Sequence, residues 1–308
     1  MTMEKKPGTY KLVLILSIGV IAISIASIWI KRCTAPTLVI AFYRLSIASV
    51  FYLGLSYTRV STRLKRRGIP HKFLMILSGI FLALHFAFWI TSLRYTSVAS
   101  SVVLVQTSPI FIALGSCLLL KERMNWRLFL GITITLCGAL IIGTNDASLK
   151  GSQLLGNALA VAGALCAAGY LIIGRRVRDN METITYVAIV YSAAAITILL
   201  LIWIKQHSLI NFSTQTYFYL VGIAIGPQII GHTSLNWALK YLSATSVAVV
   251  ALGEPIGATI LAVFLLGEQP SLIKIVGAVI ILAGVSFTLY AENRKKISSH
   301  RCLYAKPG

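Results

Sequence analysis

The chain has 308 residues, of which 57% are hydrophobic and 12% are charged. The formal net charge of +20 would suggest nucleic-acid binding in a soluble protein. A charged share of about half the usual value argues against a soluble domain, and we expect no nucleic-acid partner.

Apolar stretches of about 18 or more residues recur along the chain, as a helix that crosses a ~30 Å hydrocarbon core requires. The ten segments are 12–30, 37–57, 73–93, 98–119, 127–144, 154–174, 184–204, 216–239, 244–265 and 272–290. The linkers between them are too short for a soluble domain. The sequence therefore predicts an all-α polytopic membrane protein with ten transmembrane helices in a lipid bilayer.

The first apolar segment follows Lys5, Lys6 and Lys11 and ends in Lys31-Arg32, not in small residues suited to cleavage. We therefore expect a retained first helix and not a signal peptide.

The basic residues predict an orientation. With the amino terminus inside, most of the 28 Lys and Arg residues lie in cytoplasmic segments. The external loops then hold Lys31, Arg32, Arg94, Lys150, Lys205 and Lys274. This is the positive-inside bias, which the opposite orientation would invert. We expect a multi-pass protein of the cell inner (plasma) membrane with both termini cytoplasmic and a basic tail at 292–308.

The chain contains an internal repeat. Residues 93–140 align without a gap with residues 239–286, so that Pro109 matches Pro255. Similarity of this kind in apolar sequence is typical of secondary transporters.

The repeat predicts a first five-helix unit at 1–144 and a second at 145–291. Because five is odd, the second unit must enter the membrane upside down. The basic residues Lys121, Arg123 and Arg127 follow the fourth segment, but the equivalent positions after the ninth are Gly267, Gln269 and Ile273. Basic residues thus occur on the predicted cytoplasmic side in both units, and not at the same aligned positions of the repeat. This pattern predicts that the two units are inverted relative to each other. Inverted repeats indicate alternating access around a site near the midplane.

Two stretches and one tripeptide carry a family resemblance. Residues 108–123 run from Ser-Pro to Lys-Glu-Arg, residues 253–268 run from Gly-Glu-Pro to Gly-Glu, and Phe42-Tyr43-Arg44 lies in the second segment. The pattern resembles the drug/metabolite transporter (DMT) superfamily and, within it, the EamA-type permease family. The resemblance implies a ten-helix fold, carrier activity driven by an ion gradient or by exchange, and a central substrate cavity between the halves. It does not specify the substrate.

Glu254 is the one acidic residue that lies deep in a predicted span. A charge at that depth is costly and faces a cavity or a partner. Pro255 removes a backbone donor beside it. Because desolvation favours the protonated carboxyl, Glu254 suits proton coupling, or it binds a substrate ammonium group. A neutral, purely structural Glu is the alternative.

Arg44, in the second segment, could bind a substrate carboxylate or pair with Glu254. His85 and His232 occupy near-equivalent positions in the two repeats and could relay protons, or they could be hydrogen-bonded interior residues. The remaining deep polar and aromatic candidates are Gln106, Ser108, Gln228, Asn236, Trp89 and Trp237, with Pro109 and Pro255 as helix kinks.

Sequence motifs of enzyme chemistry are missing. The chain has no nucleotide-binding P-loop, zinc-binding His-Glu-x-x-His or nucleophile elbow, and its five Cys have no paired spacing. We therefore expect no enzyme activity, no metal and no cofactor. The expected function is secondary active transport of a small metabolite such as an amino acid or a derivative, proton-coupled or exchange-driven, by a monomer or homodimer. A passive channel or facilitator and a non-transporting membrane scaffold are the alternatives.

Overall fold

The computed structural model describes residues 9–66, 69–120, 126–149, 151–178, 183–238 and 250–304. Within these ranges all regular structure is helical. The helices are α1 (Thr9–Ser24), α2 (Ala26–Arg32), α3 (Thr37–Arg66), α4 (Ile69–Tyr95), α5 (Val98–Val105), α6 (Ser108–Leu120), α7 (Trp126–Leu149), α8 (Gly151–Arg178), α9 (Thr183–Lys205), α10 (Thr214–Ile223), the π-helix η1 (Ala224–His232), α11 (Thr233–Ala238), α13 (Gly253–Leu266) and α14 (Leu272–Tyr304).

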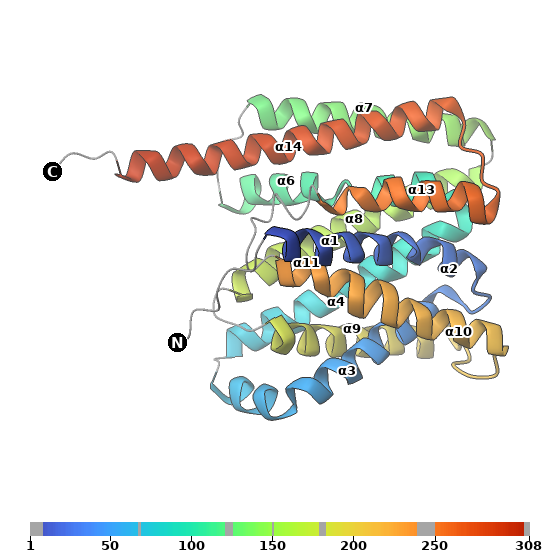
Figure 1. Ribbon diagram of the computed structural model, residues 1–308, viewed down its shortest axis with the longest axis vertical. Coiled ribbons are helices and arrows are strands. Elements are labelled where there is room, and N and C mark those ends of the chain that lie inside the picture. Colours follow the sequence, from blue (N-terminus) through green and yellow to red (C-terminus); the bar gives the residue numbers. More distant parts are fainter. Residues whose placement is uncertain are drawn as a thin grey trace.

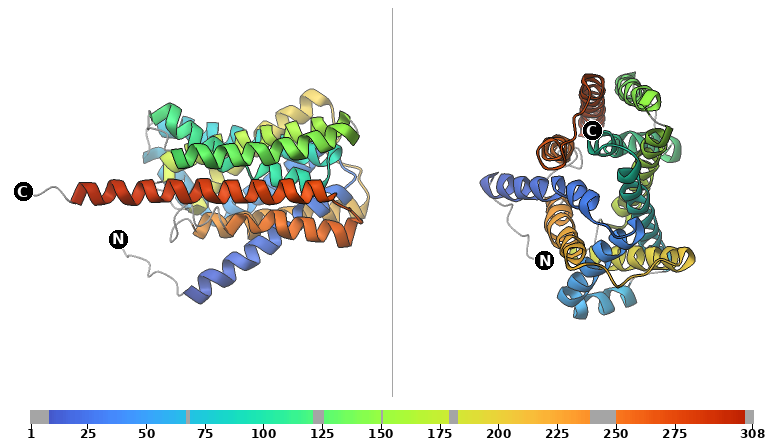
Figure 2. Two further views of the ribbon diagram at one scale, coloured as in Figure 1. Left: turned by 90° about the horizontal axis from the view of Figure 1, so that it is seen from above. Right: turned by 90° about the vertical axis from the view of Figure 1, so that its right-hand side faces the viewer.

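The helices run roughly along one common direction and form a bundle (Figure 1), and Figure 2 shows several of them end-on. Helix α1 begins and α14 ends toward the same end of this bundle. Residues 292–304 continue α14, so the predicted basic tail starts as part of the last helix.

Six stretches of the described chain are long and apolar enough to cross a membrane. They are Tyr10–Arg32, Thr37–Ser56, Lys72–Tyr95, Gly151–Gly174, Thr183–Lys205 and Thr214–Ala238. Four shorter apolar helices overlap the other predicted segments, and they are Val98–Ile112, Phe129–Ile142, Gly253–Leu266 and Leu272–Phe287. Such sequences fold as helices because a backbone away from water must satisfy its hydrogen bonds internally.

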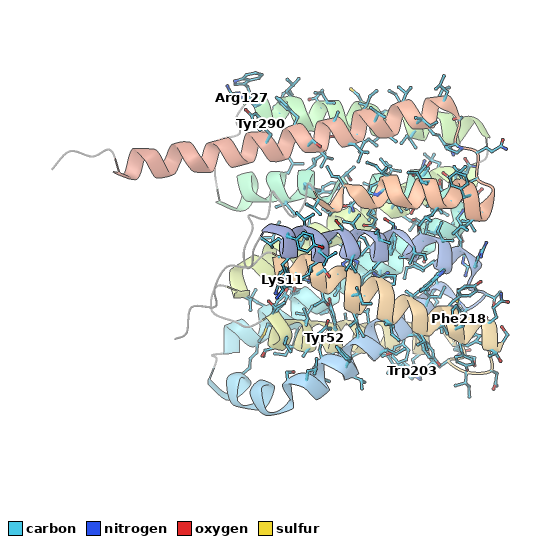
Figure 3. All side chains as sticks on the ribbon, in the orientation of Figure 1. Lys11, Tyr52, Arg127, Trp203, Phe218 and Tyr290 are labelled. Atoms are coloured by element: carbon cyan, nitrogen blue, oxygen red, sulfur yellow. The ribbon has the colours of Figure 1, made fainter. Side chains whose placement is uncertain are left out.

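The outer surface of the bundle is apolar. Trp203 is 78% exposed and Phe218 is 65% exposed, and both project from the bundle (Figure 3). A soluble protein rarely exposes so many large apolar side chains together. The chain is therefore a multi-pass helical membrane protein.

Two predicted spans are interrupted beside a proline. Helix α5 ends at Val105 and α6 begins at Ser108, while α13 begins at Gly253 after a turn at Leu252. The cause is the proline in each following turn, because its ring clashes with the carbonyl four residues earlier and it donates no N–H. For Pro109 that carbonyl belongs to Val105, the last residue of α5. Residues 239–249 lie outside the described residues, and they include the first part of the ninth predicted span, 244–249.

Helices α7 and α14 pack along glycines. A Cβ added at Gly138 would lie 2.8 Å from the Gly277 carbonyl oxygen, and one added at Gly284 would lie 2.7 Å from the backbone nitrogen of Thr135. Only glycine permits so close an approach of two helix backbones. The seam joins helices that come from the two different predicted repeats.

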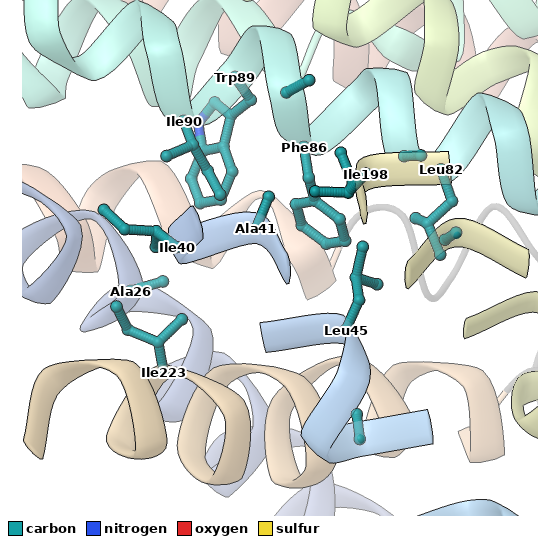
Figure 4. Packing of buried hydrophobic residues seen from close by; sticks show 14 of the residues in the cluster. Ala26, Ile40, Ala41, Leu45, Leu82, Phe86, Trp89, Ile90, Ile198 and Ile223 are labelled. Carbon is teal, nitrogen blue, oxygen red and sulfur yellow. The ribbon is translucent and has the colours of Figure 1, made fainter. Parts of the chain in front are cut away.

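The largest apolar cluster lies where α3, α4 and α9 meet. Phe86 and Trp89 of α4 pack beside Ala41 and Leu45 of α3, with Ile198 of α9 close by (Figure 4). Phe86 and Trp89 of this cluster also contact Arg44, which is described next.

Candidate substrate and coupling site

Glu254 lies where three interrupted helices meet. It stands in the first turn of α13 and is 8% exposed. The Gln106 side-chain amide, at the break between α5 and α6, donates to Glu254 Oε2 at 2.9 Å. Ser24, just before the break at Ile25 between α1 and α2, donates to the Glu254 carbonyl oxygen at 3.5 Å. Three backbone irregularities therefore surround one buried carboxyl.

The same amide also satisfies the broken backbone. Gln106 Nε2 lies 3.4 Å from the carbonyl oxygen of Ala251, the residue four positions before Pro255. That carbonyl has no helical donor, because proline has no N–H. Gln106 and Leu252 occupy aligned positions of the sequence, so the breaks at these two positions contact one another.

Arg44 of α3 lies at the centre of a second cluster. The side chain is completely buried, and its Nε donates to Gln228 Oε1 at 2.6 Å. Its Cζ is 4.2 Å from the ring centre of Phe86 and 5.6 Å from that of Trp89. The face of the guanidinium is thus stabilised by the aromatic rings of α4.

Three buried donors of this cluster have no acceptor. They are Nη1 and Nη2 of Arg44 and Nε1 of Trp89. Buried polar groups without partners are uncommon and costly, and each one calls for an explanation.

The two histidines that the sequence suggested as site residues, His85 and His232, both contact Phe86. His85 Nδ1 is 2.9 Å from the Gly163 carbonyl oxygen, and the His85 ring stacks on Trp89 at 6.2 Å with an interplanar angle of 7°. The Phe86 ring lies 4.9 Å from the His85 ring and 6.0 Å from that of His232. Phe86 therefore connects the histidines of the two predicted repeats.

Gln228 and His232 are held by the π-helix η1. Pro227 inside this segment lacks a backbone donor, and wide π-turns are frequent at functional sites. The Tyr52 hydroxyl of α3 is 2.6 Å from Thr233 Oγ1 and 3.3 Å from the Ile229 carbonyl oxygen. These bonds fix η1 against the helix that carries Arg44.

The two clusters interact without a direct ion pair. Arg44 and Glu254 are close enough to act on each other electrostatically. Within the part of the chain that the structure describes, however, their charged atoms do not approach to 4.0 Å. The direct pairing that the sequence offered as one alternative is not present in this conformation.

The other sequence candidates lie at varied distances from these clusters. Ser108 and Pro109 begin α6 and are buried beside the break, and Pro255 directly follows Glu254. Asn236 Nδ2 donates to the His232 carbonyl oxygen at 3.0 Å. Trp237 packs in a separate small cluster near Leu16 and Val250 of the described chain.

Sequence reasoning missed three aromatic residues. The Phe86 ring packs on the Arg44 guanidinium, the Tyr52 hydroxyl bonds the end of η1, and Tyr191 of α9 lies close to Arg44 and Gln228. The signal available in the sequence was the position of Phe86 between His85 and Trp89. Nothing local distinguishes Tyr52 or Tyr191 from other aromatic residues in apolar segments.

A separate polar group lies at one end of the bundle. Lys31 Nζ contacts Glu268 Oε1 at 2.8 Å, and the Glu268 carboxylate accepts the backbone N–H of Val98, at the start of α5, at 3.2 and 3.0 Å. We call this group the Lys31–Glu268 latch. It joins the end of α2, the second residue after α13 and the first turn of α5. The matching Glu122 lies outside the described residues.

No group of three or more His, Cys, Asp or Glu side chains in the described chain is arranged to hold a metal ion. The two polar clusters instead consist of one guanidinium, one carboxyl, side-chain amides, two imidazoles and aromatic rings. Paired and isolated charges inside a membrane-spanning bundle are typical of proteins that move solutes or protons.

Comparison with known proteins agrees with this class. The model of the EamA-like transporter family matches the chain twice, over residues 10–144 and 154–290. The chain belongs to the EamA-like transporter family, which confirms the resemblance seen in the sequence. It is a membrane transporter by family.

Several named relatives are similar over most of their length. An "Uncharacterized transporter" of Archaeoglobus fulgidus is 27% identical over 264 residues, which cover 83% of this chain and 88% of that protein. "Uncharacterized transporter YdfC" of Bacillus subtilis is 26% identical over 261 residues, covering 83% and 82%. "Pseudopaline exporter CntI" of Pseudomonas aeruginosa is 24% identical over 216 residues, covering 70% and 73%.

A solved structure titled "Crystal structure of protein" has the same fold. It covers 91% of this chain and 98% of its own, with a TM-score of 0.63 and 19% sequence identity.

Proposed function

We propose that the chain is a secondary active carrier of small metabolites that works by alternating access. One observation carries the proposal: the buried carboxyl of Glu254 is bonded to Gln106 where two matching helix breaks meet. Discontinuous helices whose breaks carry polar groups near the middle of the bilayer are a recurring architecture of carrier sites. Arg44 lies within electrostatic reach of the same carboxyl.

The proposed topology is ten transmembrane helices in two inverted repeats. The two family matches, the paired breaks and the seam between α7 and α14 support a two-part architecture. Six long and four shorter apolar helices of the described chain supply the segments. An even number of crossings also agrees with α1 beginning and α14 ending at one end of the bundle.

The proposed location is the cell inner membrane with both termini in the cytoplasm, as the distribution of basic residues predicts. On this orientation the Lys31–Glu268 latch lies at the external end. The carrier acts as a monomer or a homodimer.

Amino acids or their derivatives are the proposed substrates. A substrate with a carboxylate and an ammonium group could use both buried charges, Arg44 and Glu254. The one relative above that is named for a substrate is a pseudopaline exporter. The driving force is a proton gradient or exchange, with Glu254 as the residue that binds the proton or the substrate ammonium.

The test is release of a defined mixture of amino acids and related metabolites from proteoliposomes under an imposed pH gradient. Wild type is compared with Glu254→Gln, which keeps the size and the hydrogen bonding of the side chain but cannot ionise. Glu292→Gln is the matched control, because it removes the same charge outside the apolar segments. We expect selective, gradient-dependent release from wild type and from the control, and none from Glu254→Gln.

Saturation and trans-stimulation distinguish a carrier from a passive channel or a scaffold. A carrier saturates because each molecule has a limited number of binding sites. It shows trans-stimulation because the site can return faster with substrate bound than empty. Release that stays linear with concentration would indicate a channel. No release of any solute would favour the scaffold. Equal release from wild type and Glu254→Gln would remove this residue from the mechanism.

A further inference from the structure

The arrangement around Arg44 leaves one edge of the guanidinium unused. Its Nε bonds Gln228 and its face lies on Phe86, so the terminal nitrogens Nη1 and Nη2 remain without acceptors. Trp89, on the same side of α4 as Phe86, adds a third buried donor without an acceptor. A buried cation with unpaired N–H groups is among the most costly features that a protein interior can hold.

The unused donors point to the shape of an acceptor. Nη1 and Nη2 form the end-on fork of the guanidinium, which matches the two oxygens of a planar carboxylate. Gln228 fixes the fork, because its bond to Nε stops rotation of the guanidinium about Cδ–Nε. The indole N–H of Trp89 can donate to one of the same oxygens.

Charge favours a carboxylate over a phosphate. Within the described chain, the only other buried Lys or Arg is Lys274, which lies on α14. The other ionisable neighbours of Arg44 are His85, His232, Tyr191 and the acidic Glu254. One guanidinium balances a monoanion but leaves the second charge of a phosphate dianion buried and unpaired.

We propose that Arg44, Trp89 and Gln228 form a subsite that binds the carboxylate group of the transported molecule. Arg44 and Trp89 contact the carboxylate, and Gln228 is a positioning residue. The inference rests on the proposed carrier function, since it names the group by which the carrier recognises its substrate.

The experiment measures binding with the full-length protein in detergent. Radiolabelled benzoate is the probe, and unlabelled benzamide, a neutral compound of nearly the same shape, is the matched competitor. We expect benzoate to bind and benzamide to compete at least tenfold more weakly than unlabelled benzoate. Acetate and acetamide repeat the comparison without an aromatic ring.

The variants separate binding from folding. Arg44→Gln should weaken benzoate binding at least tenfold, and Trp89→Phe should weaken it several-fold. Arg127→Gln removes a positive charge on α7 and should leave binding unchanged. Gln228→Glu places a carboxylate against Arg44 Nε, so it should raise thermal stability and yet weaken benzoate binding at least tenfold. A purely structural role of Gln228 does not predict that combination.

The outcomes of the two proposals can be told apart. Equal competition by benzoate and benzamide, or equal benzoate binding by wild type and Arg44→Gln, would overturn the subsite even if metabolites are transported. Carboxylate binding that depends on Arg44, in a protein that releases nothing from proteoliposomes, would support the subsite and refute the carrier.

Discussion

Replacing Glu268 by Gln should open the proposed external end of the bundle more often. The change keeps an acceptor for the Val98 N–H but removes the attraction to Lys31. Cys33 supplies a native reporter, because it follows α2 directly, is completely buried and is a free thiol. Burial raises the pKa of the Cys33 thiol, which lowers the fraction of reactive thiolate. Opening both exposes the sulfur and removes this suppression.

The magnitude follows from the geometry of the latch. The Lys31 and Glu268 side chains are 25% and 17% exposed, so their 2.8 Å contact is partly screened by solvent. A pair of this kind contributes about 1 kcal/mol. Exchanging the charge-assisted bond to Val98 for a neutral one loses about a further 0.5–1 kcal/mol. A total of about 1.5–2 kcal/mol corresponds to a roughly 10- to 30-fold increase in the open fraction.

The assay is the rate of Cys33 modification by a membrane-impermeant maleimide added outside right-side-out vesicles. Glu268→Gln should raise that rate about 10- to 30-fold. Lys31→Gln should raise it only about fivefold, because it breaks the ion pair but leaves the charge-assisted bond from Val98 to Glu268 in place. The double variant should add little, because both changes break the same contact. Lys205→Gln, which removes an exposed lysine at the end of α9, is the control. An unchanged rate in Glu268→Gln, or an equal increase in Lys205→Gln, would refute the reasoning.

Three further changes test the packing and the site. Gly284→Ala should lower the free energy of unfolding by about 1–3 kcal/mol, since the new methyl group meets the backbone of α7. Gly54→Ala is the control and should not lower it, because a Cβ there meets no atom within 4 Å. Thermal unfolding of both variants checks this. Tyr52→Phe should cost about 1 kcal/mol, because the hydroxyl bond to Thr233 is lost, and equal melting temperatures would contradict it. Gln106→Ala removes the donor to the buried carboxyl of α13, and the rate of gradient-driven release should fall about tenfold, which proteoliposome flux measures.

The broad architecture could be predicted because its causes are local in the sequence. Long apolar runs predict helices that cross a bilayer, and the structure has apolar helices at the predicted segments. The prolines Pro109 and Pro255 indicated where two helices would be disturbed. In the sequence, Gly131 with Gly138 and Gly277 with Gly284 recur seven residues apart, which predicts a close contact between helices. Only the structure shows that α7 and α14 are the partners and that the contact lies within one chain.

The contacts of the site could not be predicted in the same way. A helix that is apolar on all sides gives no sign of which face points inward. Sequence therefore grouped Trp237 with Trp89, although the structure packs them in different clusters. The π-helix η1 was also missed, because Pro227 in an apolar run reads as an ordinary kink.

The π-helix has a mechanical consequence. It holds more residues per turn than an α-helix, so a shift of hydrogen-bond register by one residue would rotate everything beyond it by about 100°. Gln228 and His232 lie within this adjustable stretch, while Arg44 lies on the uninterrupted α3. Arg44 therefore has a fixed position, whereas a one-residue change in the hydrogen bonding of η1 would turn Gln228 and His232 relative to it.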